Sequence, residues 1–362
     1  MINYTLNFLP TKFFIFGCGG TGSRLVPQVA QFLYTIPWLR ILKPKIVIVD
    51  PDQVEAKNLE RQNFVGSDIG KNKAVVLANR YSKAYGCEII AIPEIFNLNA
   101  VSSGFDRKSP ATSTYEGLYK CIQGPGISSA ISSANGLFNN SIIFICVDSI
   151  SARQSVFETI YKTASDPCII IDTGNENDFG QVKLHGSKVL GDQYDDITKY
   201  DDIPKYDDIP KYNSIPRNIP IDVDISTLPV DISYFYDMPE PAVKDSCADM
   251  DQTMAINSLV ATTAFSVLQN LLFRKPISWH RMNISLGHGS YPEYLSVDYI
   301  LSLNKQAKKR NGSYITDYLP MCHDIWEKLT FIYEQMKKGF PFMLKEDSTD
   351  EEGGGEEFTE QI

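Results

Sequence analysis

Short runs of consecutive β-branched and aromatic residues recur along the first half of the chain, separated by segments with helical periodicity. The runs lie at residues 12–16 (KFFIF), 45–49 (KIVIV), 88–93, 141–147 (SIIFICV) and 168–172 (CIIID). A strand without polar alternation is typical of a parallel sheet that helices cover on both faces. The sequence therefore predicts a doubly wound, Rossmann-like α/β fold with a mostly parallel sheet.

Three helices are expected between and after these strands. Residues 23–42 form one helix in this prediction, with Pro27 tolerated in or near its first turn. Residues 73–85 form a second helix. Residues 254–273 carry no charge and are long enough to cross a membrane. Polar side chains interrupt this segment and its apolar residues follow helical spacing, so a buried amphipathic helix is expected, and no membrane partner.

Two segments break the alternation of strands and helices. Residues 97–140 are rich in Ser, Gly and Asn and are expected to form an irregular insertion. Residues 190–245 are expected to form a loop that contains a six-residue repeat at 194–217 (YDDITK, YDDIPK, YDDIPK, YNSIPR). Proline in three of the four copies excludes a helix or a central strand. The repeat is explained by replication slippage in a tolerant surface loop or by a partner-binding role.

Charge and cysteine content limit the possible functions. The net charge is −10, but residues 346–362 hold eight acids and no base, which leaves about −2 for the rest of the chain. A chain so close to neutral has no excess of basic residues to attract nucleic acid, so no nucleic-acid partner is expected. The seven cysteines are widely spaced without a C-x-x-C pair, which indicates reduced thiols and a cytoplasmic location. No signal peptide is recognisable at the N-terminus.

A glycine-rich turn follows the first predicted strand and opens the first helix. Its glycines are Gly17, Gly19, Gly20 and Gly22, in the order G-x-G-x-x-G. Glycines let the backbone approach a phosphate, and the helix N-terminus offers free amides with a partial positive charge. Asp50 ends the second strand, where a carboxylate can bind ribose hydroxyls. Up to this point an NAD-dependent oxidoreductase explains every feature.

The stretch after Asp50 separates the alternatives. Residues 50–62 (DPDQVEAKNLERQ) are followed by residues 68–73 (DIGKNK). This order resembles the family of ThiF, MoeB and the ubiquitin-activating enzymes, whose pattern runs D-x-D-x-V-x-x-x-N-L-x-R-Q and then D-x-G-x-x-K. The resemblance covers about residues 12 to 290. It implies an ATP-binding adenylation domain of the ThiF type over residues 1–300. The residues that follow predict a helical extension (301–345) and a disordered acidic tail (346–362).

The charges in this stretch have a chemical reason. A triphosphate carries more negative charge than the pyrophosphate of a dinucleotide and needs additional cations. Arg61 and Lys73 can supply them, while Asn58 and Gln62 are neutral donors. For each of these four residues taken singly, the alternative is a place in a solvent-exposed charged loop or helix start that binds no ligand.

Asp148 follows the fourth predicted strand, in the sequence VDSISAR. A carboxylate at the carboxyl edge of a parallel sheet faces the ligand crevice. The resemblance implies that Asp148 holds Mg²⁺ beside the phosphates. Capping of the following helix is the alternative, and both roles can hold at once. Arg153, four residues into that helix segment, could contact the nucleotide or pair with an acid.

A narrower resemblance rests on later residues. Residues 172–175 (DTGN) and 179–182 (FGQV) are expected to form strand, glycine turn and strand. Together with Cys247 in the sequence SCA, they resemble ThiF-like proteins of bacterial ParB-related, ThiF-related mobile cassettes. Family members often use a downstream cysteine to form a thioester, and a helix N-terminus after Cys247 would favour the thiolate. A buried, inert thiol is the alternative.

The combined prediction is an enzyme that uses ATP and Mg²⁺ to adenylate a terminal carboxylate, and the resemblance implies that the carboxylate is the C-terminus of a ubiquitin-like or sulfur-carrier-like protein. The products are an acyl-adenylate and pyrophosphate, and the resemblance implies a homodimer. Many family members donate an arginine from an N-terminal helix across the dimer, but residues 1–16 contain none, so Arg24 is a candidate. The rival functions are a nucleotide-binding scaffold of a mobile element without turnover, and the NAD-dependent oxidoreductase.

Overall fold

The computed structural model describes residues 1–95, 137–163, 167–186, 215, 219–228, 253–301 and 319–338. Its strands are β1 (Ile2–Thr5), β2 (Lys12–Phe16), β3 (Lys45–Val49), β4 (Ile89–Ile92), β5 (Ser141–Ile145), β6 (Ile169–Asn175), β7 (Phe179–Gly186), β8 (Ile221–Asp224), β9 (Arg281–Ser285) and β10 (Gly289–Glu293). The α-helices are α1 (Gly22–Thr35), α2 (Pro37–Leu42), α3 (Lys73–Tyr85), α6 (Ile150–Thr163), α8 (Met254–Leu272) and α10 (Leu319–Lys337). Short 3-10 turns are η1 (Ala56–Asn58), η2 (Gly66–Asp68) and η6 (Ile225–Thr227).

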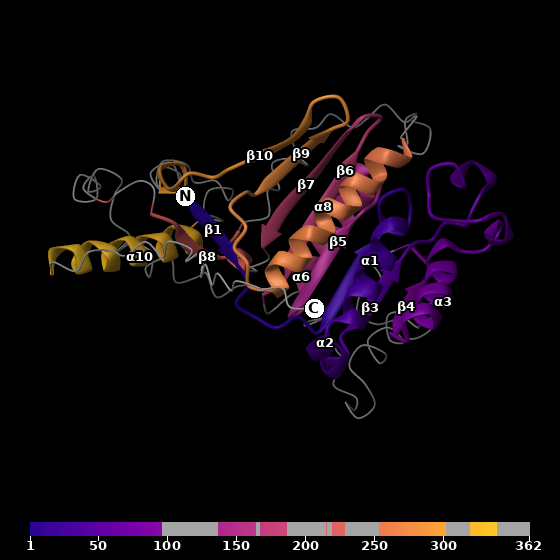
Figure 1. Ribbon diagram of the computed structural model, residues 1–362, viewed down its shortest axis with the longest axis horizontal. Coiled ribbons are helices and arrows are strands. Elements are labelled where there is room, and N and C mark those ends of the chain that lie inside the picture. Colours follow the sequence, from indigo (N-terminus) through magenta and orange to yellow (C-terminus); the bar gives the residue numbers. More distant parts are fainter. Residues whose placement is uncertain are drawn as a thin grey trace, which may run out of the picture.

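The main sheet has eight strands in the order β10-β9-β7-β6-β5-β2-β3-β4 (Figure 1). Strands β4, β3, β2, β5 and β6 run parallel. Strands β7, β9 and β10 continue the sheet in antiparallel fashion. The mostly parallel α/β sheet predicted from the sequence is confirmed. The carboxyl ends of the five parallel strands meet at one edge, which is where such sheets place ligands.

Both faces of the sheet are covered, as the unbroken apolar runs predict. Phe13 and Ile15 of β2 belong to the core under α1, α3 and α8. Phe14 and Phe16, which point to the other face, belong to a separate core that includes α6. Burial of successive residues on opposite faces explains why these strands show no polar alternation.

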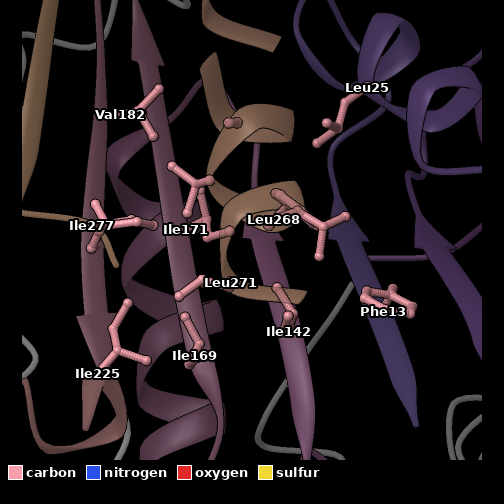
Figure 2. Close-up of a cluster of buried hydrophobic side chains, with 14 of the residues drawn as sticks. Phe13, Leu25, Ile142, Ile169, Ile171, Val182, Ile225, Leu268, Leu271 and Ile277 are labelled. Carbon is pink, nitrogen blue, oxygen red and sulfur yellow. The ribbon is translucent and has the colours of Figure 1, made fainter. Parts of the chain in front are cut away.

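Helix α8 is the long uncharged segment expected to be buried. It contacts α1, β6 and β7, and Val260 and Leu268 are fully buried. Figure 2 shows Leu268 and Leu271 directed from α8 toward the strands that carry Ile142 and Ile171. Thr253 caps the helix by accepting a hydrogen bond from the amide of Ile256 at 3.2 Å. By length and composition α8 could also cross a membrane, and half of that window is buried in the protein.

The expected single helix over residues 23–42 is wrong, because the chain forms two helices. Ile36 is extended at φ −85° and ψ 117°, and α2 begins at Pro37. The residue before a proline is disfavoured in the helical region, so α1 ends at Thr35. Pro27 is also deeper than expected, since α1 begins at Gly22 and Pro27 lies beyond the first turn.

The strand, turn and strand at residues 172–182 differ from the expectation in one detail. Gly174 lies inside β6, and the β6–β7 register continues to Asn175 opposite Gly180. The turn therefore consists of residues 176–178, without glycine. The sequence analysis did not identify β1, β8, β9 or β10. These short strands lack apolar runs, and β1 pairs with β8 across more than half the chain.

Several predictions lie largely or wholly outside the described residues. They concern most of the insertion at 97–140, almost all of the repeat at 194–217, Cys247 and the acidic tail at 346–362. In the segment 301–345, residues Leu319–Lys337 form helix α10.

Candidate active site

A cavity of about 590 Å³ lies at the carboxyl edge of the parallel strands. Most residues singled out from the sequence line it, namely Gly17, Gly19, Gly20, Asp50, Asn58, Arg61, Gln62, Lys73 and Asp148. Gly22 does not line the cavity, because it lies behind the turn as the first residue of α1. The fold thus brings segments from four parts of the sequence to one place.

The glycine turn wraps tightly around the end of β5. Gly17 has φ +89°, and a Cβ at this position would lie 2.6 Å from the carbonyl oxygen of Cys146. Only glycine meets both conditions. Among the described residues, the backbone amides of Gly19, Gly20 and Thr21 donate no hydrogen bond. The turn therefore presents free N–H groups at the start of a 14-residue helix, the arrangement that favours an anion.

Asp50 shapes the turn from the end of β3. Its carboxylate accepts hydrogen bonds from the amide of Cys18 at 2.5 Å and from the amide of Asp52 at 2.8 Å. Burial raises the pKa of Asp50, while Lys73 and the two amides oppose that rise. Each carboxylate oxygen already accepts a hydrogen bond from a backbone amide. The side chain therefore stabilises the loop and also faces the cavity.

Asp52 and Lys73 form an ion pair in the cavity wall. The distance between Lys73 Nζ and Asp52 Oδ2 is 3.0 Å. The Lys73 side chain is only 8% exposed, whereas the Asp52 side chain is 65% exposed. The cation is therefore buried in the cavity wall, whereas its acidic partner reaches it from the solvent side. The sequence analysis missed Asp52, although it is the second aspartate of the D-x-D pattern.

The neutral residues of the same stretch differ in how they are used. Asn58 is buried and its Oδ1 accepts a hydrogen bond from the amide of Glu55 at 2.8 Å, which caps η1. Gln62 is buried too, and its Oε1 has no hydrogen-bond partner among the described residues. A buried acceptor without a donor is costly in a folded protein, so this oxygen is suited to a ligand that donates.

Asp148 lies exposed at the mouth of the cavity. Ser149 caps the following helix, because the amide of Ala152 donates to its Oγ at 3.2 Å, and capping by Asp148 stays a prediction. Among the described residues there is no cluster of three or more His, Cys, Asp or Glu side chains that could hold a metal. One carboxylate is the donor set that suits Mg²⁺, which keeps waters and binds substrate phosphates.

The two arginines with open roles are now placed. Arg153 forms a buried ion pair with Asp172 and donates from Nη2 to the carbonyl of Val147 at 2.7 Å, so pairing with an acid is its role in this structure. Arg24 donates from Nη2 to the carbonyl of Arg61 at 3.4 Å and does not line the cavity. Arg24 therefore supports the Arg61 loop and is not placed to replace the missing N-terminal arginine.

A second cavity of about 560 Å³ adjoins the first and shares Val147, Asp148 and Asn175 with it. Its floor is the antiparallel part of the sheet, where Gln181 of β7, Asn283 of β9 and Tyr291 of β10 stand side by side in the strand register. Phe179 and Tyr291 are 57% and 50% exposed there. This surface combines amide side chains with aromatic rings.

One family model matches part of this chain. Residues 6–174 match the profile of the ThiF family. Similar solved structures include PaaA, with 14% sequence identity and a TM-score of 0.44 over 79% of this chain and 64% of PaaA. E. coli MccB with ATP has 18% identity and a TM-score of 0.41 over 79% of this chain and 64% of MccB.

E. coli tRNA N6-threonylcarbamoyladenosine dehydratase, TcdA, has 17% identity and a TM-score of 0.30 over 46% of this chain and 53% of TcdA. The chain thus spans less than two thirds of the length of each of these structures. The comparison with curated protein sequences gave no match.

Proposed function

Since residues 6–174 of this chain form a ThiF-family domain, we propose that the protein binds ATP·Mg²⁺ in the first cavity and adenylates a carboxylate. The observation that carries this proposal is the meeting of the glycine turn with Arg61, Lys73 and Asp148 around one cavity. An NAD-dependent oxidoreductase would use the glycine turn and leave this set of charges without a role.

The residues of the cavity suit the parts of ATP. The free amides at Gly19, Gly20 and Thr21 offer donors for phosphate oxygens, and Lys73 and Arg61 supply positive charge. Asp148 would hold Mg²⁺, which neutralises the phosphates and orients them for attack. The unpartnered Oε1 of Gln62 is an acceptor for an amino or hydroxyl group of the nucleoside. The cavity volume lies within the range of small-molecule sites.

The proposed reaction is an in-line displacement at the α-phosphorus. An oxygen of the acceptor carboxylate forms a bond to this phosphorus, and the bond from it to the β-phosphate oxygen breaks. Pyrophosphate leaves, and the acceptor becomes an acyl-adenylate. Positioning of the two reactants and neutralisation of phosphate charge would supply most of the catalysis.

We propose the second cavity as the approach for the acceptor. It shares Asp148 and Asn175 with the first cavity, so a carboxylate that ends there would face the α-phosphate. Amide side chains such as Gln181 and Asn283 can bond the backbone of an extended peptide. The proposed substrate is accordingly a flexible C-terminal tail of a ubiquitin-like or sulfur-carrier-like protein, and transfer of the acyl group to Cys247 as a thioester stays a prediction.

Binding measurements test the nucleotide assignment. Titration calorimetry with ATP·Mg²⁺ and with NAD should give a clear isotherm for ATP and none for NAD. Arg61→Ala and Lys73→Ala should each weaken ATP binding, whereas Asp298→Ala, at an exposed position that lines neither cavity, should not. Tight binding of NAD with none of ATP would end the adenylation proposal.

Turnover separates the enzyme from a scaffold. The rival is a scaffold that binds nucleotide without reaction, and the position of Arg24 outside the cavity is compatible with it. ATP–pyrophosphate exchange, measured with the ubiquitin-like proteins of neighbouring genes, should exceed the background without acceptor. ATP binding with no exchange from any of these acceptors would favour the scaffold.

A further inference from the structure

Asn257 is a fully buried amide in the first turns of α8, among apolar residues that pack on the sheet. A buried polar side chain is costly unless it is hydrogen-bonded. Asn257 is bonded on both sides of its amide group. An apolar residue would pack as well on this face of the helix, so the hydrogen bonds of the buried amide call for a functional explanation.

The two hydrogen bonds of Asn257 join distant segments of the chain. Its Oδ1 accepts from Nδ2 of Asn175, the last residue of β6. Its Nδ2 donates to the backbone carbonyl of Arg61 at 3.4 Å. Asn175 lines both cavities and Arg61 lines the first, so Asn257 connects their walls from behind.

Asn257 also contacts the glycine turn. A Cβ placed on Gly20 would lie 2.5 Å from Oδ1, 2.6 Å from Cγ and 2.6 Å from Nδ2 of Asn257. Gly20 does not have a left-handed backbone, so its glycine is explained by this close approach and not by φ. The side chain of Asn257 occupies the space that any larger residue at position 20 would need.

We infer that Asn257 is a positioning residue for the nucleotide site, which holds the glycine turn and the Arg61 loop against the end of β6. This inference rests on the proposed function and deepens it. One buried side chain sets the distance between the phosphate-binding amides, the Arg61 loop and the boundary of the acceptor cavity. Helix α8, almost 200 residues after Arg61, is therefore part of the site.

The first experiment measures nucleotide affinity at a temperature where every variant is fully folded. Asn257→Ala should weaken binding of ATP·Mg²⁺ about 10-fold, the effect of losing a hydrogen-bonded group that preorganises its partners. Asn270→Ala, the same substitution near the other end of α8, is the matched control and should bind like the wild type. Unchanged affinity of the folded Asn257→Ala variant would overturn the inference, because a purely structural role would lower only the melting temperature.

The second experiment tests the contact without nucleotide. Gly20→Ala should lower the melting temperature through the clash with Asn257, whereas Gly66→Ala, where a Cβ meets nothing within 4 Å, should not. In the double variant Gly20→Ala/Asn257→Ala the clash is gone, so the loss should be clearly smaller than the sum of the single losses. Additive losses would overturn the contact.

The two experiments also distinguish this inference from the proposed function. If the wild type binds no ATP, the proposed function fails, and the melting temperatures still decide whether Asn257 positions the glycine turn. If the wild type binds ATP and the double-variant cycle is additive, the inference fails and the proposed function stands.

Discussion

The acidic residues of the nucleotide cavity differ in environment and therefore in role. Asp50 is buried and bonded to the amides of Cys18 and Asp52, so it maintains the loop. Asp52 is exposed and holds Lys73. Asp148 is exposed at the boundary of the two cavities, where a metal bound to phosphates would lie close to both substrates.

Asp148→Ala should reduce catalysis without unfolding the protein. Loss of one electrostatic contact to the reacting phosphates costs about 2.7–4 kcal/mol, or roughly 10²–10³ in rate. Stability should change by no more than about 0.5 kcal/mol, because the side chain is exposed and Ser149 caps the helix. ATP–pyrophosphate exchange at matched circular dichroism measures the effect, with Asp298→Ala as the control. An active wild type with an unimpaired Asp148→Ala variant would remove the metal role.

Asp68 should make the stability of the protein depend on pH. Burial opposes its ionisation, but the amide of Val65 and the guanidinium of Arg80 outweigh burial and lower the pKa of Asp68. A lowered folded-state pKa contributes stability that is present above the unfolded-state value of about 3.9 and is lost as pH falls through the folded value.

Urea unfolding of the wild type and of Asp68→Asn between pH 7 and pH 3 measures this contribution. The free energy of unfolding of the wild type should fall more steeply below about pH 4 than that of the variant. Parallel profiles would show that Asp68 has the same pKa in the folded and unfolded chains.

At the scale of elements, the sequence predicted the bounds of some helices correctly and missed a break in another. Helix α3 has the predicted bounds, Lys73–Tyr85, because Asn72 caps its start and Gly86 ends it in a left-handed conformation. The break between α1 and α2 was missed, although Pro37 marks it. Apolar spacing continues across the break, and a proline inside an amphipathic pattern can also be tolerated, as Pro27 shows.

Deletion of residues 194–217 should leave the fold intact. The repeat is rich in Asp and Pro, and a segment of this composition buries little apolar area. Its one described residue, Ile215, is buried in the main core, so any loss of stability should come from that side chain. The melting temperature should shift by no more than a few degrees, and ATP binding should persist. The matched control for chain length is a variant that keeps the six Asp residues and the one Asn of the repeat but replaces its prolines with alanine. A large fall in melting temperature on deletion would show that the repeat packs against the domain.

For the whole molecule, a homodimer stays a prediction. An apolar surface on the last turn of α1 and on α2 gives it a physical basis, since Tyr34, Trp38, Ile41 and Leu42 are all exposed. Neighbouring exposed apolar residues of this kind mark interaction sites. Light scattering should give twice the chain mass of 40.7 kDa.

Ile41→Asp should shift the protein toward the monomer, because Ile41 is the most exposed of these residues at 82%. Phe331→Asp, at a 62% exposed position on α10, is the matched control and should keep the dimer. A monomeric wild type at micromolar concentration would contradict the prediction, and a dimeric Ile41→Asp variant would place the interface elsewhere.

The sequence by itself determined the parallel half of the sheet, because strands buried on both faces must be apolar at every position. It also determined the glycine turn and the stretch from Asp50 to Lys73, since phosphate approach restricts side-chain size and charge over short distances along the chain.

Only the tertiary structure decided which partners these residues have. Arg153 pairs with Asp172, Lys73 with Asp52, and Asn257 with Asn175 across 82 residues. The antiparallel extension of the sheet and the second cavity likewise depend on pairings between strands far apart in the chain. No periodicity records such contacts, because a lone asparagine in an apolar helix looks the same whether it faces solvent or holds a distant loop.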